Sequence, residues 1–82
     1  MKFIITFGSN QLPELHNKLN PMKVMIVIEA KDEREARNIA FDSFVGRNFC
    51  TSYPYEPFAK KFADDYGMVE YSLKELEGIK NG

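Results

Sequence analysis

The chain has 82 residues, of which 44% are hydrophobic and 13% aromatic, and its formal net charge is −1. This length predicts a single domain over residues 1–82, because two halves would each be too small to bury a core. The composition excludes an intrinsically disordered chain, and the balanced charge argues against indiscriminate nucleic-acid binding, which needs a basic excess. No apolar run approaches a membrane span, and a lone cysteine is typical of a reducing compartment. We therefore expect a cytoplasmic protein.

Two strands and a helix are predicted in the first half of the chain. Residues 2–7 alternate apolar side chains, and residues 22–30 hold five consecutive apolar residues, which is typical of a strand buried on both faces. Asp32 and Glu35 resemble a capping box for a helix expected over residues 33–45, with Gly46 as its left-handed cap. The fourteen residues from Gly8 to Pro21 show almost no regular pattern. A connection this long favours a binding loop or a disordered one.

The second half predicts two more strands and two more helices. A strand is expected over residues 49–53, and a helix that begins near Pro57 and ends at Gly67 carries Phe58, Phe62 and Tyr66 at helical spacing. A last strand over residues 68–71 precedes a short helix opened by Ser72. The order β-β-α-β-α-β predicts an α+β domain, with a small, mostly antiparallel sheet and helices packed on one face.

No catalytic or metal-binding constellation accompanies these elements. His16, the only histidine, has no nucleophile, carboxylate or further ligand at a recognisable spacing. Cys50 alternates within a predicted strand, where a small buried hydrophobe is the default. We therefore expect a non-enzymatic protein with no metal and no cofactor.

Two sets of residues are candidates for binding. Tyrosine beside proline is typical of protein interfaces and equally of loops anchored on a core, and the predicted partner-binding set is Asn10, Gln11, His16, Tyr53 and Tyr55. A glycine turn can present backbone N–H groups to an anion, and arginines can converge on the same ligand; the predicted anion-binding set is Gly8, Ser9, Arg34, Arg37 and Arg47. Arg37 falls inside the apolar arc of the first helix, so its alternative role is structural, with the stem over aromatic rings.

Short motifs in this order resemble a group of small uncharacterised bacteriophage and prophage proteins. They are a Thr-Phe-Gly strand end, a second strand ending in Ala, a Glu-Ala-Arg helix and an aromatic-x-Gly helix end. The matching residues are Thr6, Phe7, Gly8, Ala30, Glu35, Ala36, Arg37, Phe44, Gly46, Tyr53, Tyr66 and Gly67, and the resemblance covers about two-thirds of the chain. The chain departs from the group at Gln11, where relatives tend to have histidine, and at Phe49, where they tend to have tryptophan. The resemblance implies a phage or prophage origin and brings no established activity.

We therefore expect a small phage protein that binds and inhibits a host protein, for example a defence component, in the manner of an anti-CRISPR protein. The reasons are its size, the missing catalytic constellation, the long connection and an acidic C-terminal half. The alternative is a protein that sequesters a nucleotide-like anion, with its pocket between two copies of the chain, because one chain offers little room for a cavity. A nucleic-acid accessory role comes third, since the chain lacks a basic stripe.

Overall fold

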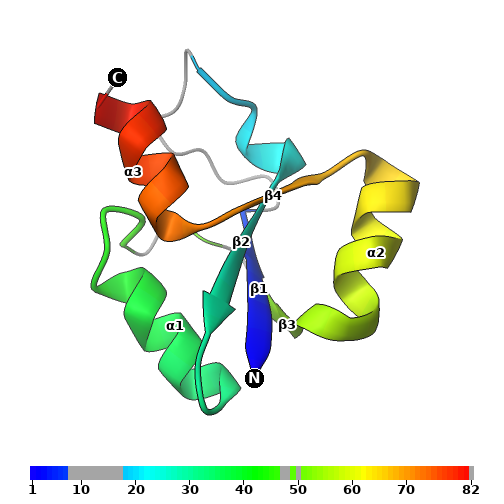
Figure 1. Cartoon of the computed structure of the whole chain (residues 1–82), viewed down its shortest axis with the longest axis horizontal. Coiled ribbons are helices and arrows are strands. Elements are labelled where there is room, and N and C mark those ends of the chain that lie inside the picture. Colours follow the sequence, from blue (N-terminus) through cyan, green and yellow to red (C-terminus); the bar gives the residue numbers. More distant parts are fainter. Residues whose placement is uncertain (8–17, 47–48, 50, 82) are drawn as a thin grey trace.

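The computed structural model describes residues 1–7, 18–46, 49 and 51–81. One four-stranded sheet lies at the centre of these residues, and three α-helices flank it (Figure 1). The strands are β1 (Lys2–Thr6), β2 (Val24–Glu29), β3 (Thr51–Pro54) and β4 (Val69–Tyr71). The helices are α1 (Glu33–Phe41), α2 (Tyr55–Tyr66) and α3 (Leu73–Asn81), and a 3-10 helix, η2 (Pro21–Lys23), leads into β2. The predicted α+β class is confirmed.

The sheet has the strand order β3-β1-β2-β4. β1 pairs antiparallel with β2, with Thr6 opposite Met25, and antiparallel with β3, with Thr6 opposite Thr51. β4 runs parallel to β2, with Val24 opposite Val69. The sheet is therefore mixed, and the antiparallel pairings predominate as predicted.

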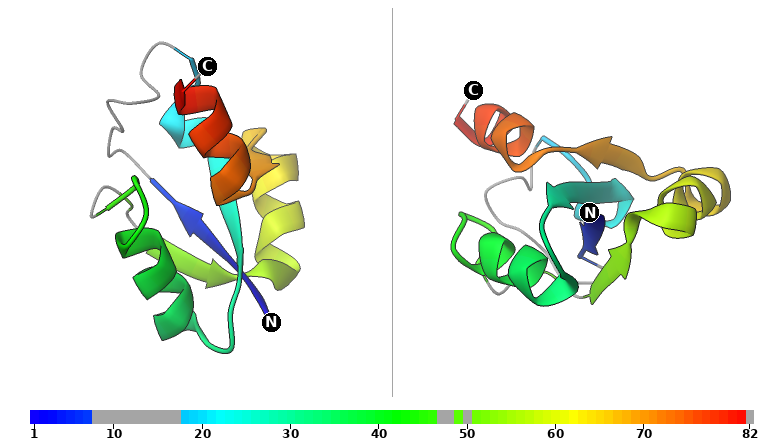
Figure 2. Two further views of the ribbon diagram at one scale, coloured as in Figure 1. Left: turned by 60° about the vertical axis from the view of Figure 1, so that its left-hand side comes forward. Right: turned by 60° about the horizontal axis from the view of Figure 1, so that its bottom comes forward.

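Both faces of the sheet are covered by helices. The sequence predicts helices on one face, and α1 and α3 do share a face, where Ala36 and Leu76 belong to the same buried cluster as Ile5. α2 instead packs on the opposite face, where Ala59 lies over Ile4. The second view in Figure 2 shows α2 on one side of the strands, with α1 and α3 on the other. The physical reason is that β1 and β2 carry apolar side chains at consecutive positions, so each face needs a helix to exclude water.

The start of α1 follows the predicted capping pattern, and its end comes earlier than predicted. The Asp32 carboxylate accepts a hydrogen bond from the Glu35 amide at 2.8 Å, and the Glu35 carboxylate accepts one from the Lys31 amide at 3.1 Å. The helix ends at Phe41 because the Ser43 hydroxyl donates to the Ala40 carbonyl at 2.7 Å and accepts from the Val45 amide at 3.1 Å. Such side-chain bonds compete with the helix ladder. Gly46 does adopt a left-handed conformation (φ 58°), but beyond this turn.

The ends of α2 and the start of α3 agree with the sequence. The backbone of Glu56 is extended, so the regular part of α2 begins at Pro57, and Gly67 ends the helix with a φ of 67°. The Ser72 hydroxyl accepts from the Glu75 amide at 3.0 Å, while the Glu75 carboxylate accepts from the Ser72 amide at 2.9 Å. This reciprocal pair is the predicted capping box.

Candidate functional site

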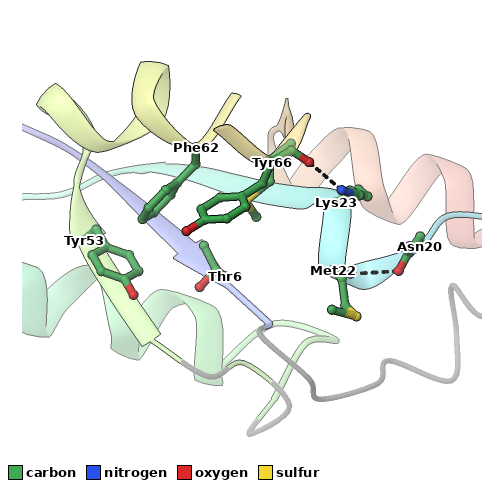
Figure 3. A pocket seen from close by; sticks show the side chains of 8 residues that line it. Thr6, Asn20, Met22, Lys23, Tyr53, Phe62 and Tyr66 are labelled. Atoms are coloured by element: carbon green, nitrogen blue, oxygen red, sulfur yellow. Dashed lines mark hydrogen bonds between the residues drawn. The ribbon is translucent and has the colours of Figure 1, made fainter. Parts of the chain in front are cut away.

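A hollow of about 350 Å³ opens between the C-terminal half of α2, the ends of β1 and β3, and the turn that enters β2 (Figure 3). We call it the aromatic hollow and define it by its lining residues, Thr6, Asn20, Met22, Lys23, Tyr53, Phe62, Tyr66 and Met68. The rings of Phe62 and Tyr66 project from α2 toward Thr6, and Tyr53 faces them from β3. Residues from distant parts of the chain therefore meet at one opening.

The walls of the aromatic hollow belong to a connected cluster of rings. Tyr53 meets Phe62 edge-on, with ring centroids 5.0 Å apart, and lies 5.1 Å from Phe58. Phe62 is 5.7 Å from Phe58 and 6.0 Å from Tyr66. Tilted and edge-to-face pairs at these separations are favourable arrangements for aromatic rings. The cluster holds Tyr53 and Phe62 in place, whereas Tyr66 is 57% exposed and stands at the rim.

Lys23 places a positive charge at the rim of the aromatic hollow. The Lys23 ammonium donates a hydrogen bond to the Tyr66 carbonyl at 2.5 Å, which joins η2 to the last turn of α2. The Asn20 side chain accepts from the Met22 amide at 3.0 Å and so fixes the start of η2. Of the described residues that line the hollow, Lys23 alone is charged. The described part of the lining thus combines aromatic walls with one cation and no carboxylate.

The structure separates the two tyrosines of the predicted partner-binding set. Tyr53 lines the aromatic hollow, whereas Tyr55 lines a different depression together with Pro57, Ala59 and Glu70. The Tyr55 hydroxyl donates to the Glu70 carboxylate, whose two oxygens lie at 2.8 and 3.0 Å. Tyr55 therefore ties the start of α2 to β4. The other predicted members, Asn10, Gln11 and His16, lie outside the described residues.

We expect the contact with Glu70 to make the phenol of Tyr55 lose its proton at a higher pH than an ordinary tyrosine. The hydrogen bond to Glu70, helped by desolvation and by the negative charges of Glu70 and Glu56, raises the pKa of Tyr55 above its ordinary value of 10.0. Because the folded-state pKa is the higher one, the contribution to stability is complete below pH 10.0 and is lost as the pH rises through the folded-state value. Ultraviolet absorbance follows the ionisation of tyrosine, and the difference between the titration curves of wild type and Tyr55→Phe reports Tyr55. The midpoint of this difference should lie above pH 10.0. A midpoint at or below pH 10.0 would contradict the contact with Glu70.

The described members of the predicted anion-binding set lie on α1, away from the aromatic hollow. Arg34 and Arg37 are exposed and line a shallow depression that they share with Glu33, whose carboxylate would repel an anion. The Arg37 guanidinium lies 5.9 Å from the centroid of the Phe49 ring, which agrees with the structural alternative for this arginine. Gly8, Ser9 and Arg47, together with Cys50, lie outside the described residues.

No group of three or more His, Cys, Asp or Glu side chains within residues 1–7, 18–46, 49 and 51–81 is placed to hold a metal ion. No helix in these segments has the length and the apolar character needed to cross a membrane.

Sequence reasoning found Tyr53 but missed the rest of the aromatic hollow. Phe62 and Tyr66 were placed only at helical spacing within the second predicted helix, and in the structure Tyr66 is exposed. The position of Tyr66 in the last turn of α2, directly before Gly67, is the signal that could have identified the rim. Lys23 carried no local signal, since its partner Tyr66 is 43 residues away in the sequence.

Comparison with known proteins adds no relative to this description: no family model, no curated protein and no solved structure matches the chain. The resemblance to phage proteins therefore stays a prediction from short motifs. The aromatic hollow is the structural feature on which a functional proposal has to rest.

Proposed function

We propose that this protein is a small non-enzymatic binding protein and that the aromatic hollow is its contact site. One observation carries the proposal: two exposed apolar side chains, Tyr66 at 57% and Met22 at 59%, stand at the rim of an opening with aromatic walls. Large apolar groups that gather at a surface mark interaction sites, and tyrosines in such pockets contribute strongly to protein binding.

We further propose that the bound molecule is a host protein. The phage origin implied by the sequence motifs supports this class of partner, and a defence component is the target that a small phage inhibitor would most usefully occupy. Inhibition would then follow from covering a surface of the host protein, for which no catalytic group is needed.

Tyr66→Ser is the change that tests this proposal. Because the ring is mostly exposed, we expect the fold to persist, while affinity for the host protein falls by about 2 kcal/mol, or about 30-fold in Kd. The measurement is affinity capture from lysates of several bacteria, with the retained protein identified by mass spectrometry and its Kd then measured with the purified partner.

The matched control is Val69→Ser. Val69 is 52% exposed and also apolar, but it lies on β4 and does not line the aromatic hollow. Wild type and Val69→Ser should retain the same host protein with similar affinity. If Tyr66→Ser bound the host protein as tightly as wild type does, the aromatic hollow would be excluded as the contact site.

A further inference from the structure

We infer that the aromatic hollow accepts one aromatic side chain of its partner together with a carboxylate beside that side chain. The ring packs against Tyr53, Phe62 and Tyr66, which line the hollow, and the carboxylate meets the ammonium of Lys23. This inference rests on the proposed function and adds the chemistry by which the partner is recognised.

The hollow is large enough for a planar ring, and its walls suit one. Its volume of about 350 Å³ lies at the small end of the range of binding pockets, roughly 300–1,000 Å³. The surrounding rings are already tilted or edge-on to one another, which are the arrangements in which an added ring also packs favourably. The Met22 and Met68 side chains line the same space, and thioethers make favourable contacts with aromatic rings.

The charge at the rim fits a single carboxylate. The Lys23 ammonium has three N–H groups, and its hydrogen bond to the Tyr66 carbonyl holds it beside the opening while using one of them. Of the described lining residues none is Asp or Glu, so a carboxylate would meet attraction from Lys23 without a lining charge that repels it. A cationic ligand would instead be repelled by Lys23.

The charges near the hollow favour a carboxylate over a phosphate. A phosphate monoester carries about −1.5 to −2 charges at neutral pH, whereas Lys23 supplies one positive charge. A nucleotide is therefore the poorer match.

Three small probes with the same ring test the inference without a known partner. Indoleacetate is an anion, tryptophol is neutral and tryptamine is a cation, and each is titrated into the isotope-labelled full chain while the amide and methyl resonances are followed by NMR. We expect shifts at the hollow and an affinity order of indoleacetate, then tryptophol, then tryptamine. The preference for the anion over the neutral probe should be about two- to fivefold, the size of an exposed ion pair.

Variants assign this preference to Lys23. In Lys23→Gln, the preference for indoleacetate over tryptophol should disappear while tryptophol still binds. In Lys23→Arg this preference should persist. The matched control is Lys61→Gln, which removes an exposed lysine that does not line the hollow. If Lys23→Gln does not fold, Lys23→Arg still tests the inference, because a variant that keeps the positive charge must also keep the preference for indoleacetate.

The outcomes separate this inference from the proposed function. Equal binding of all three probes at the hollow would overturn the carboxylate, while the loss of host-protein affinity in Tyr66→Ser could still uphold the contact site. Adenosine monophosphate binding more tightly than indoleacetate, through Lys23, would overturn the inference in favour of a nucleotide. Probes that shift no hollow resonance would overturn the ring pocket itself.

Discussion

Replacing Ile4 with alanine is expected to lower the free energy of unfolding by about 2–5 kcal/mol, and replacing Ile5 is expected to cost a similar amount. The two residues are neighbours in β1, and both are fully buried (0% exposed). Ile5 packs in the cluster under α1 and α3, and Ile4 packs in the cluster under α2. Each truncation therefore leaves a cavity under a different helical layer, and close-packed neighbours fill such a cavity only in part.

Urea unfolding followed by circular dichroism measures both costs, with the exposed Met22→Ala as a control expected to stay within about 0.5 kcal/mol of wild type. Comparable losses for Ile4→Ala and Ile5→Ala require a sheet that is covered on both sides. A loss for Ile5→Ala accompanied by a negligible one for Ile4→Ala would contradict the placement of α2.

Leu76→Ala is expected to lower the free energy of unfolding by about 2–5 kcal/mol and to release α3 from the sheet. Leu76 is the buried residue of α3, and it packs in the same cluster as Ile5 and Ile26. An isolated helix as short as α3, nine residues, is marginal in water, so its helicity depends on this packing.

Amide hydrogen exchange distinguishes a local release of α3 from a global loss of stability, because regions that open locally exchange without global unfolding. We expect the amides of α3 in Leu76→Ala to lose protection before those of β1 and β2. Glu77→Ala, at the neighbouring exposed position, should change stability by no more than about 0.5 kcal/mol. Unchanged protection of α3 in Leu76→Ala would show that other contacts hold this helix.

The elements could be predicted where the signal is local. Asp32, Gly67 and Ser72 mark helix ends through contacts within a few residues, and all three do so in the structure. The end of α1 was missed because Ser43 forms a competing turn that a count of apolar spacing does not reveal. Caps and periodicity thus specify where most elements lie, though not how each one ends.

The arrangement of the elements could not be predicted in the same way. The parallel pairing of Val24 with Val69 joins strands separated by a helix, a strand and a second helix, and no short-range pattern encodes it. The apolar run from Val24 to Ile28 indicates a strand buried on both faces, yet it does not say which helix covers which face. The site depends on the same long-range geometry, since Tyr53, Lys23 and Tyr66 meet only after the sheet has formed.

The position of β1 and β2 at the centre of the sheet affects how the chain folds during its synthesis. These strands leave the ribosome before their outer partners, since Thr6 pairs with Thr51 and Val24 with Val69. Until then the β1–β2 pair exposes apolar side chains on two faces and unpaired backbone groups on two edges, which are features that promote aggregation. The order in which the strands emerge therefore sets the risk of aggregation during synthesis, independently of the stability of the finished fold.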